Sequence, residues 1–435
     1  MKSSWALAAG IVSVGALVAC SDESSDRVED TSSGGASGSS GQPNGPGASS
    51  SSGGSSGAGG ASSGGASSGG SSGTSTGDGG VIPTGSGRLA LGTKHSCALD
   101  AAGGVRCWGD NTDGQLGDGT EVARLQPAAV ALPGPALKVA ASADATCALL
   151  EDRTVACWGH GTRGQLGDGA SQSSNRPQIV PDLLAVDIDG GGYGHLCAVT
   201  PAGAVVCWGQ GNEGQLGQGS NESATTPTQV TGLTSGWTQV SAGHEATCAR
   251  SEAGAVRCWG NNFYGQLGDG THSDSNTPVD VVGLASGVRT IEVGANQTCA
   301  VLENGSVQCW GWNLGTLGTA EGSDDQLPAP VVGLNDGVTR VAPGNGQLCA
   351  LRQGAVLCWG DNEAGAVGNG SRDDVLAPTP IASLSTGIVD VFAAYDHTCA
   401  MAANGAIHCW GKNESGQLGD GTTTDRLVPV LVVVP

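Results

Sequence analysis

The chain has 435 residues and a formal net charge of -22 at pH 7, with 18 Lys and Arg against 40 Asp and Glu. This balance argues against a nucleic-acid-binding surface, because such surfaces gain most of their affinity from cations that neutralise phosphates. Aromatic residues are 3% of the chain and Gly numbers 77, a composition that favours short strands and tight turns over long helices.

The first twenty residues have the pattern of an export signal. Lys2 supplies a positive charge, and residues 5–18 form an apolar run too short to span a bilayer stably. Residues 17–20, Leu-Val-Ala-Cys, resemble the lipobox of bacterial lipoproteins, which implies a signal peptide over 1–19 and lipidation of Cys20. An ordinary signal peptide cut near Ala19 is the alternative. Both interpretations predict an exported protein, and the first predicts a lipoprotein of the cell envelope, on its periplasmic or cell-surface side.

Residues 20–80 are predicted to be a lipid-anchored, disordered tether. An acidic start gives way to a stretch that is almost wholly Gly, Ser, Ala and Thr, with no apolar face to bury. A flexible coil of about 50 residues reaches roughly 40 Å, which would hold a folded domain clear of lipid headgroups. No later segment approaches 18 consecutive apolar residues, so contact with the membrane is expected through the anchor alone.

Residues 81–435 are a repeat. A segment that opens on Cys-Ala and closes on Cys-Trp-Gly recurs seven times, with its first cysteine at positions 97, 147, 197, 248, 299, 349 and 399. A step of about 50 residues is typical of propeller blades. In the first copy, four short strands are expected at 89–91, 96–99, 105–108 and 127–132, separated by Gly-rich or polar turns. The fold class is therefore all-β, a seven-bladed β-propeller of four-stranded antiparallel blades.

The repeat resembles that of the regulator of chromosome condensation family. Residues 107–111 read Cys-Trp-Gly-Asp-Asn and residues 114–120 read Gly-Gln-Leu-Gly-Asp-Gly-Thr, and close copies follow at 259–268 and 410–419. The fifth and sixth copies depart from the Gln-Leu pair, with Thr316-Leu317 and Ala366-Val367. The resemblance covers about 350 residues and implies the same propeller architecture.

The ends of the repeat suggest how the ring closes. The last copy ends on an apolar strand at 427–434 and has no successor, whereas residues 88–92 precede the first cysteine as a spare strand. We expect this N-terminal strand to pair with the C-terminal blade, because such pairing would remove exposed sheet edges.

The cysteines beyond Cys20 form seven pairs, one in each blade and none left over. Each pair flanks the turn of one hairpin, so the two thiols can meet across paired strands. Export favours disulfides over the alternatives of zinc ligands, which need four-ligand clusters, or reduced buried thiols. The predicted disulfides are Cys97–Cys107, Cys147–Cys157, Cys197–Cys207, Cys248–Cys258, Cys299–Cys309, Cys349–Cys358 and Cys399–Cys409.

Catalytic, cofactor and metal sites are not predicted. His95, His195 and His397 stand two residues before a cysteine in different blades, so they cannot share one metal or nucleophile, and a packed structural role is expected. Hydrolase, phosphate-loop and zinc-protease motifs are absent from the sequence. The Asp- and Asn-rich loop at 110–114 raises calcium as an alternative, but Thr112 and Gly114 fall at positions that would need oxygen ligands, and turn chemistry explains the loop better.

A partner-binding face is predicted from the loops. In a four-stranded blade, the loop before the first cysteine and the loop after Cys-Trp-Gly open on the same face of the disc. Aromatic side chains in these loops fall on three adjacent blades, an arrangement typical of a protein or glycan contact surface. The alternative is that these rings shield blade interfaces. The candidate residues are Tyr193, His244, Phe263, Tyr264 and Trp312.

The leading functional hypothesis is an extracytoplasmic protein-binding scaffold on a lipid anchor, monomeric, without catalysis, whose partner is an unidentified envelope or secreted protein. The family's namesake is a guanine-nucleotide exchange factor on chromatin, and neither of these roles is expected here, because an exported protein meets no such GTPase and its charge is wrong for DNA. The family also includes a secreted bacterial inhibitor of β-lactamase, which resembles this chain in compartment and implies that the disc face can serve as a protein-binding platform. An inhibitor or regulator of one secreted enzyme is the second hypothesis. A protein that binds or cleaves envelope glycans is the third.

Overall fold

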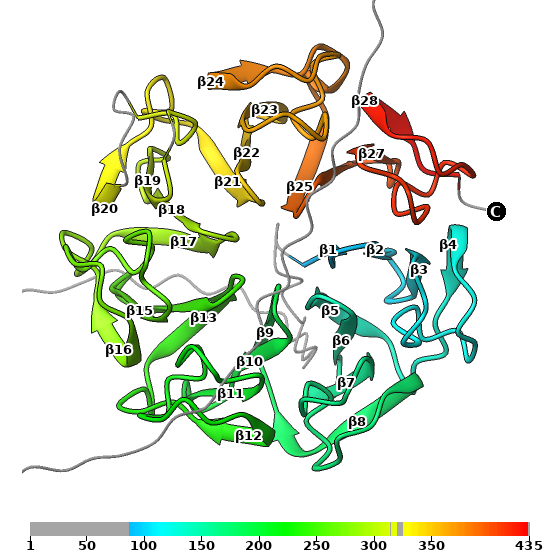
Figure 1. Ribbon diagram of the computed structural model, residues 1–435, viewed down its shortest axis with the longest axis vertical. Coiled ribbons are helices and arrows are strands. Elements are labelled where there is room, and N and C mark those ends of the chain that lie inside the picture. Colours follow the sequence, from blue (N-terminus) through cyan, green and yellow to red (C-terminus); the bar gives the residue numbers. More distant parts are fainter. Residues whose placement is uncertain (1–86, 314, 320–324, 434–435) are drawn as a thin grey trace, which may run out of the picture. The chain divides into compact units, whose positions relative to one another are not determined.

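The computed structural model describes residues 87–313, 315–319 and 325–433. Their strands form seven separate four-stranded antiparallel sheets, arranged as blades around a central axis (Figure 1). The predicted fold class and blade number are confirmed. The predicted signal peptide, the tether and Cys20 lie outside the described residues, and among those described no helix is long and apolar enough to cross a membrane.

Every blade takes its strands in chain order from the axis to the rim. Blades 1 to 3 contain β1 (Leu89–Leu91), β2 (His95–Leu99), β3 (Val105–Gly109), β4 (Arg124–Ala129); β5 (Ala136–Ala141), β6 (Ala145–Leu150), β7 (Thr154–Gly159), β8 (Ser174–Leu184); β9 (Asp187–Gly191), β10 (His195–Val199), β11 (Val205–Gly209) and β12 (Ala224–Gln229). Blades 4 and 5 contain β13 (Trp237–Ala242), β14 (Ala246–Ser251), β15 (Val256–Gly260), β16 (Ser275–Asp280); β17 (Val288–Val293), β18 (Gln297–Leu302), β19 (Val307–Gly311) and β20 (Asp325–Pro330). Blades 6 and 7 contain β21 (Val338–Pro343), β22 (Gln347–Arg352), β23 (Ala355–Gly360), β24 (Val375–Pro380); β25 (Ile388–Ala394), β26 (His397–Ala402), β27 (Ile407–Gly411) and β28 (Arg426–Leu431), with a 3-10 turn η1 (Ala382–Leu384) between blades 6 and 7.

The predicted mode of ring closure is wrong. Strand β1 pairs with β2 in its own blade, and β28 is the fourth strand of blade 7, so no strand is exchanged between the ends of the chain. Each repeat already supplies all four strands, which leaves no vacancy for a spare one. Blades 1 and 7 instead meet through side chains, with Leu89 and Leu91 packed in one buried cluster with Met401 and Leu418.

The hairpin disulfides are present in all seven blades, as the cysteine pairing predicted. In each case the two cysteines are direct cross-strand partners with Cα atoms 4.0 to 4.1 Å apart, and their side chains are fully buried. The shorter sixth pair fits a tighter turn: Arg352 pairs with Ala355, and both turn residues, Gln353 and Gly354, have positive φ, as a type I′ turn requires.

The core lies at the seams between blades. The tryptophan of each Cys-Trp-Gly segment is fully buried against residues of the preceding blade. Its indole N–H donates to a backbone carbonyl of that blade, for example from Trp259 Nε1 to Gln215 O at 2.8 Å. Gly217 has a φ of 69°, and a Cβ there would lie 2.7 Å from the same indole nitrogen, so the close approach requires glycine. In the described chain the Trp359 indole has no such partner, at the seam where Thr316 replaces the repeat's usual Gln.

Candidate functional site at the mouth of the central channel

Two sets of loops form one face of the disc, which we call the mouth face. His95 lies opposite Gly109 in the β2–β3 ladder, and the amide of Asp110 donates to Lys94 O at 2.9 Å. The loop that precedes the second strand and the loop that follows the third strand are therefore neighbours in each blade. This confirms the predicted placement of both loops on a common face.

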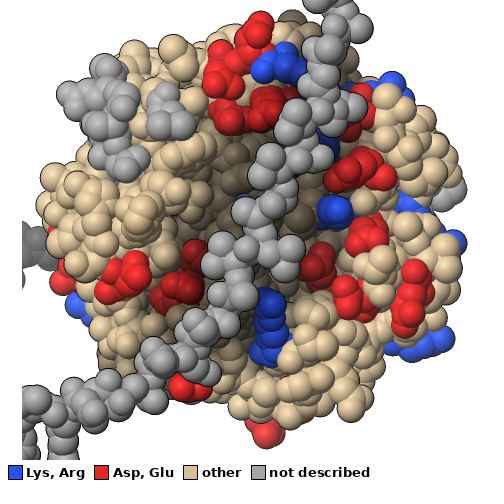
Figure 2. All heavy atoms as spheres, viewed as in Figure 1, with Lys and Arg blue, Asp and Glu red and all other residues tan. Residues whose placement is uncertain are grey.

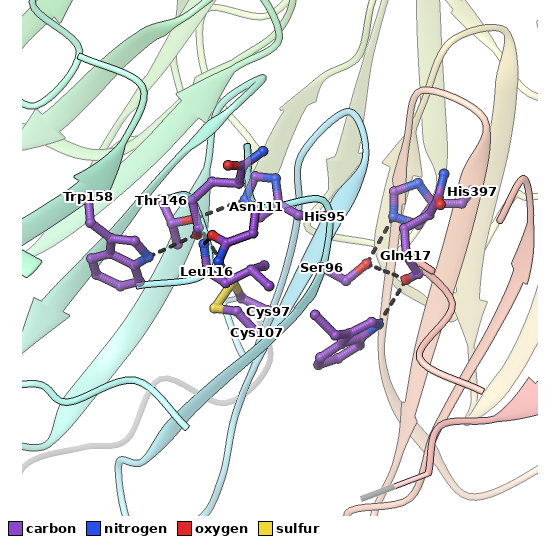
Figure 3. The surroundings of a disulfide bond; sticks show 12 residues. His95, Ser96, Cys97, Cys107, Asn111, Leu116, Thr146, Trp158, His397 and Gln417 are labelled. Carbon is purple, nitrogen blue, oxygen red and sulfur yellow. Dashed lines mark hydrogen bonds between the residues drawn. A yellow bond between two sulfur atoms is a disulfide. The ribbon is translucent and has the colours of Figure 1, made fainter. Parts of the chain in front are cut away.

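The three histidines at these positions have a structural role, as expected. His95 Nε2 lies 2.9 Å from Thr146 Oγ1, and the Thr146 hydroxyl donates to Gln115 O, which also accepts the Trp158 indole N–H (Figure 3). Because the hydroxyl hydrogen is used in that bond, we assign the hydrogen on His95 to Nε2. Burial lowers the pKa of His95 to about 4, so the ring is neutral at physiological pH.

The same chain of bonds joins two other seams. His195 contacts Thr247 at 2.9 Å, and His397 contacts Ser96 at 3.0 Å across the junction of blades 7 and 1 (Figure 3). Burial lowers the pKa of both rings to about 3. These histidines stabilise blade contacts and take no part in a common site, because they lie at three different seams.

The loops next to the axis are joined into a collar by backbone hydrogen bonds between blades. Gly192 donates to Gly243 O at 2.8 Å, His244 to Gly294 O at 3.2 Å, and Ala295 to Gly344 O at 2.9 Å. Glycine recurs in this collar because neighbouring backbones approach closely. A Cβ at Gly243 would lie 2.2 Å from Gly294 O.

Tyr395 of blade 7 reaches across the channel mouth. Its hydroxyl donates to Gly192 O of blade 3 at 3.2 Å, and its backbone has a φ of 31°, a region that bulky residues rarely adopt. Strain of this kind persists only where surrounding contacts hold it. Burial raises the pKa of Tyr395 to about 12. The residue was not among the sequence candidates, although its loop position is equivalent to that of Tyr193.

The five predicted partner-binding residues fall into two aromatic clusters. The inner cluster joins Tyr193 and His244 to Tyr395, with ring centroids 5.1 Å apart for the first pair and 4.4 Å for His244 and Tyr395. Tyr193 is 43% exposed, whereas His244 is half-buried and burial lowers its pKa to about 4. Only the tertiary structure brings blade 7 to this cluster.

The outer cluster lies on the loops of blades 4 and 5. Phe263 and Tyr264 are in edge-to-face contact at 4.9 Å, and Tyr264 lies 6.2 Å from Trp312. Phe263 is 68% exposed, while Tyr264 and Trp312 are half-buried. The Trp312 ring packs over Gly346 of blade 6, so this side chain also covers a blade junction.

Acidic side chains crowd the mouth face around the aromatic clusters. Figure 2 shows one face of the disc, where acidic side chains outnumber basic ones around a hollowed centre. Burial raises the pKa of Asp144, and the nearby Asp113 and Asp110 add to the shift. Burial likewise raises the pKa of Glu245, with further contributions from Glu213 and Asp274. The carboxylates that contribute to the raised pKa values of Asp144 and Glu245 make this surface negative, which favours a cationic partner.

The Asn-rich loops are held by their own side chains. Asn111 accepts from the amide of Leu116 at 2.9 Å, and its Nδ2 donates to the carbonyls of Thr120 and Val122 at 3.0 and 3.1 Å. Asn262 makes the equivalent bonds in blade 4. These bonds agree with the turn chemistry expected for the loop. Across the described ranges no three His, Cys, Asp or Glu side chains are grouped so that they could hold a metal ion.

Fold and site together define the class of protein: a disulfide-linked seven-bladed propeller with an aromatic and acidic loop face and a capped central channel. The family model described as RCC1-like domain matches residues 58–347, and models of the regulator of chromosome condensation (RCC1) repeat match residues 353–401, 404–435 and 388–417. The chain belongs to the RCC1-like domain family, as the repeat motif predicted. It is thus an RCC1-like propeller.

Solved structures support the fold. Prp20p from Saccharomyces cerevisiae matches with a TM-score of 0.68 and 22% identity over 77% of this chain and 87% of that chain. Human WBSCR16 matches with a TM-score of 0.65 and 25% identity over 73% of this chain and 87% of that one.

Curated relatives match over short stretches. The human E3 ubiquitin-protein ligase HERC2 is 38% identical over 76 residues, and the Arabidopsis thaliana ultraviolet-B receptor UVR8 is 35% identical over 75 residues. Each stretch is 17% of this chain, and the chain spans 2% and 17% of the lengths of these two relatives.

Proposed function

We propose that this protein is an extracytoplasmic scaffold, held to the cell envelope by a lipid on Cys20, that binds a protein partner on its mouth face and catalyses no reaction. Residues 1–19 would be removed as the signal peptide, residues 20–80 would be the tether, and residues 81–435 would present the propeller.

The observation that carries the proposal is the pair of aromatic clusters on the mouth face. Phe263 and Tyr193 are large rings with 68% and 43% exposure, and each is held by a neighbouring ring. Exposed aromatic side chains that are already held in place bind partners at a small cost in conformational entropy, and they are enriched among residues that dominate binding energy. Tyr264 would hold the Phe263 ring by direct contact, and Trp312 would in turn contact Tyr264.

The compartment is supported by the cysteines. Seven disulfides in one chain are typical of proteins that mature in an oxidising compartment, and they are rare in the reducing cytosol. The lipobox-like residues 17–20 agree with export and give the mode of attachment.

Crosslinking on intact cells tests the docking face with the full-length chain. A Tyr193→Ala/Phe263→Ala variant should lose the crosslinked partner band at least about tenfold, as expected when two central aromatic contacts are truncated. Leu376→Ala is the matched control, because Leu376 is 62% exposed on β24, outside the mouth-face loops. Equal crosslinking by the aromatic variant and the control would refute the proposed face.

A separate experiment tests the anchor. Cys20→Ser should abolish incorporation of labelled fatty acid and release the chain from the membrane fraction, while the folded propeller keeps its disulfides. Membrane retention of the unlabelled variant would refute the lipid anchor without bearing on the docking face.

A further inference from the structure

The side chains that line the central channel form two rings. The first ring consists of the inner-strand residues that pair with the first cysteine of each blade, and these are Ala90, Ala140, Asp189, Ser241, Glu292, Ala342 and Phe392. The second ring lies two residues further from the mouth along the inner strands and includes Lys138, Asp187, Gln239, Thr290, Arg340 and Asp390. Two long cationic side chains, Lys138 and Arg340, belong to the second ring, whereas alanine or serine occupies four of the seven positions of the first.

A cavity occupies the space between these rings and the mouth. It has an empty volume of about 590 Å³, open solvent included. Glycine and alanine of the collar form its walls, Asp189, Glu292 and Arg340 lie at its deep end, and Tyr395 and His244 line it at the mouth. The charged side chains of the cavity are gathered at one end.

Among the described residues, no cation lies within hydrogen-bonding distance of the two first-ring carboxylates, and Glu292 has only a long ion pair with Arg340. Arg340 Nη1 is 3.9 Å from Glu292 Oε1, while Arg340 Nε lies 3.1 Å from Asp390 Oδ1 and donates to Val391 O. Lys138 is likewise engaged, since its Nζ bonds Asp187 Oδ1 at 2.8 Å. Both cations of the second ring are thus held by second-ring carboxylates.

Glu292 has fewer hydrogen-bond partners than Asp189. Its side chain is 13% exposed, and in the described part of the chain it makes no hydrogen bond. The Asp189 carboxylate lines the cavity and accepts from the backbone amide of Ala242 at 2.9 Å, with a further backbone hydrogen bond at Gly190. A buried carboxylate whose only ion pair is as long as 3.9 Å is poorly compensated, so a positive charge placed beside Glu292 would be bound favourably.

The mouth end of the cavity is aromatic. Tyr395 spans the opening through its bond to Gly192 O, and His244 packs against the Tyr395 ring at 4.4 Å. Aromatic faces attract cations, especially where water is largely excluded. A cavity with carboxylates at one end and aromatic rings at the other matches an ammonium group better than an anion. Two carboxylates alone provide too few ligands for a metal ion, in agreement with the lack of a three-residue metal group in the described ranges.

We propose that the central cavity binds a small organic cation, with its ammonium group beside Glu292 and Asp189 and beneath the aromatic cover of Tyr395 and His244. This site shares His244 and Tyr395 with the inner aromatic cluster of the proposed docking face, but its acidic end lies inside the channel and it does not depend on a protein partner. The affinity of the Glu292 carboxylate for a proton, which is itself a positive charge, agrees with the proposal. Burial raises the pKa of Glu292 to about 7, opposed by Arg340 and Lys138 and reinforced by Asp189 and Asp187.

Calorimetric titration of the full-length protein with choline tests the site. Choline should bind saturably with an affinity of about 10 mM or tighter, and its uncharged isostere 3,3-dimethylbutan-1-ol should bind at least about tenfold more weakly. Glu292→Gln and Asp189→Asn should each weaken choline binding by about tenfold, because each keeps the side-chain shape and removes one charge. Glu151→Gln is the matched control, since Glu151 is exposed in the β6–β7 turn away from the mouth face.

Each contrary outcome overturns the proposal. Absence of saturable binding by choline, equal affinity for the neutral isostere, or unchanged affinity in both acid variants would each exclude a cation site in the cavity. Thermal unfolding of every variant establishes that the propeller is intact. Tyr395→Ala provides a second measure, because removal of the cover should weaken choline binding several-fold without removing a charge.

Discussion

The contacts between blades repeat around the ring, whereas the residues that line the central channel do not. At the seams the same elements recur around the ring: a buried disulfide, a buried tryptophan and, at most junctions, a carbonyl of the preceding blade that accepts the indole hydrogen. In the channel, equivalent positions of successive blades carry Ala, Asp, Ser, Glu and Phe. The seams are nearly uniform, whereas the axis differs from blade to blade.

The difference has a geometric reason. Seven wedges close a ring only if each junction turns by a similar angle, so residues at the seams must make similar contacts at every step. A channel position faces the axis once and is free to carry a different chemistry in each blade. Repetition therefore marks the residues that hold the fold, and departures from repetition at the axis and mouth mark residues available for binding.

The largest expected effect of a single change is at a seam. Trp259→Ala should lower the free energy of unfolding by about 3–5 kcal/mol, because it leaves a cavity in a buried cluster and removes one of the two hydrogen bonds that Gln215 O accepts. Chemical denaturation of the full-length chain measures this. A loss below about 1 kcal/mol would contradict the assignment of the seams as the stabilising region.

Removal of one hairpin disulfide should have the next largest effect. The pair Cys248→Ala/Cys258→Ala opens a loop with a sequence separation of 10 and should cost about 2–3 kcal/mol. Comparison of the variant with the wild-type protein under oxidising conditions measures the difference. Equal unfolding midpoints would show that this disulfide does not stabilise the protein.

The buried histidines predict that acid weakens the seams. The pKa of His195 is lowered from 6.5 to about 3 by burial, so between these values the unfolded chain binds a proton that the folded chain does not. Its contribution is fully present above pH 6.5 and is lost on acidification by about 1.4 kcal/mol per pH unit.

Comparison with His195→Gln separates the contribution of His195 to the pH dependence of stability from the contribution of carboxylates with raised pKa values, such as Glu292. Protonation of Glu292 on acidification has the opposite effect on stability. The stability gap between the wild-type protein and the variant, measured by denaturation between pH 7 and pH 4, should shrink by about 1.4 kcal/mol per unit below pH 6.5. A gap that is constant with pH would contradict the neutral state assigned to the buried ring.

The smallest expected effect is at the mouth face. Phe263→Ala should change the free energy of unfolding by less than about 0.5 kcal/mol, because the ring is 68% exposed and contributes little to the core. The same denaturation series measures it alongside Trp259→Ala. A destabilisation above about 2 kcal/mol would indicate that the ring shields a blade interface, which was the alternative interpretation of these aromatics.

Most of the fold could be predicted from the repeat. The spacing of the cysteines predicted the number of blades and the hairpins. The prediction of ring closure was wrong because a repeat of period 50 does not show which strand begins a blade. The terminal strand 426–431 pairs within its own blade. The channel could not be predicted at all, because Asp189 and Glu292 are 103 positions apart and meet only through the curvature of the ring.

The sequence by itself determined the seven blades, their disulfides, the buried tryptophans and the common face of the loops, because these follow from local pairing repeated at a fixed interval. The tertiary structure alone decided that Tyr395 crosses the mouth to Gly192, that two acids share a cavity, and that five candidate aromatics divide into two clusters. The physical reason is that strand pairing is local within a blade, whereas contacts across the axis depend on the summed rotation of all seven.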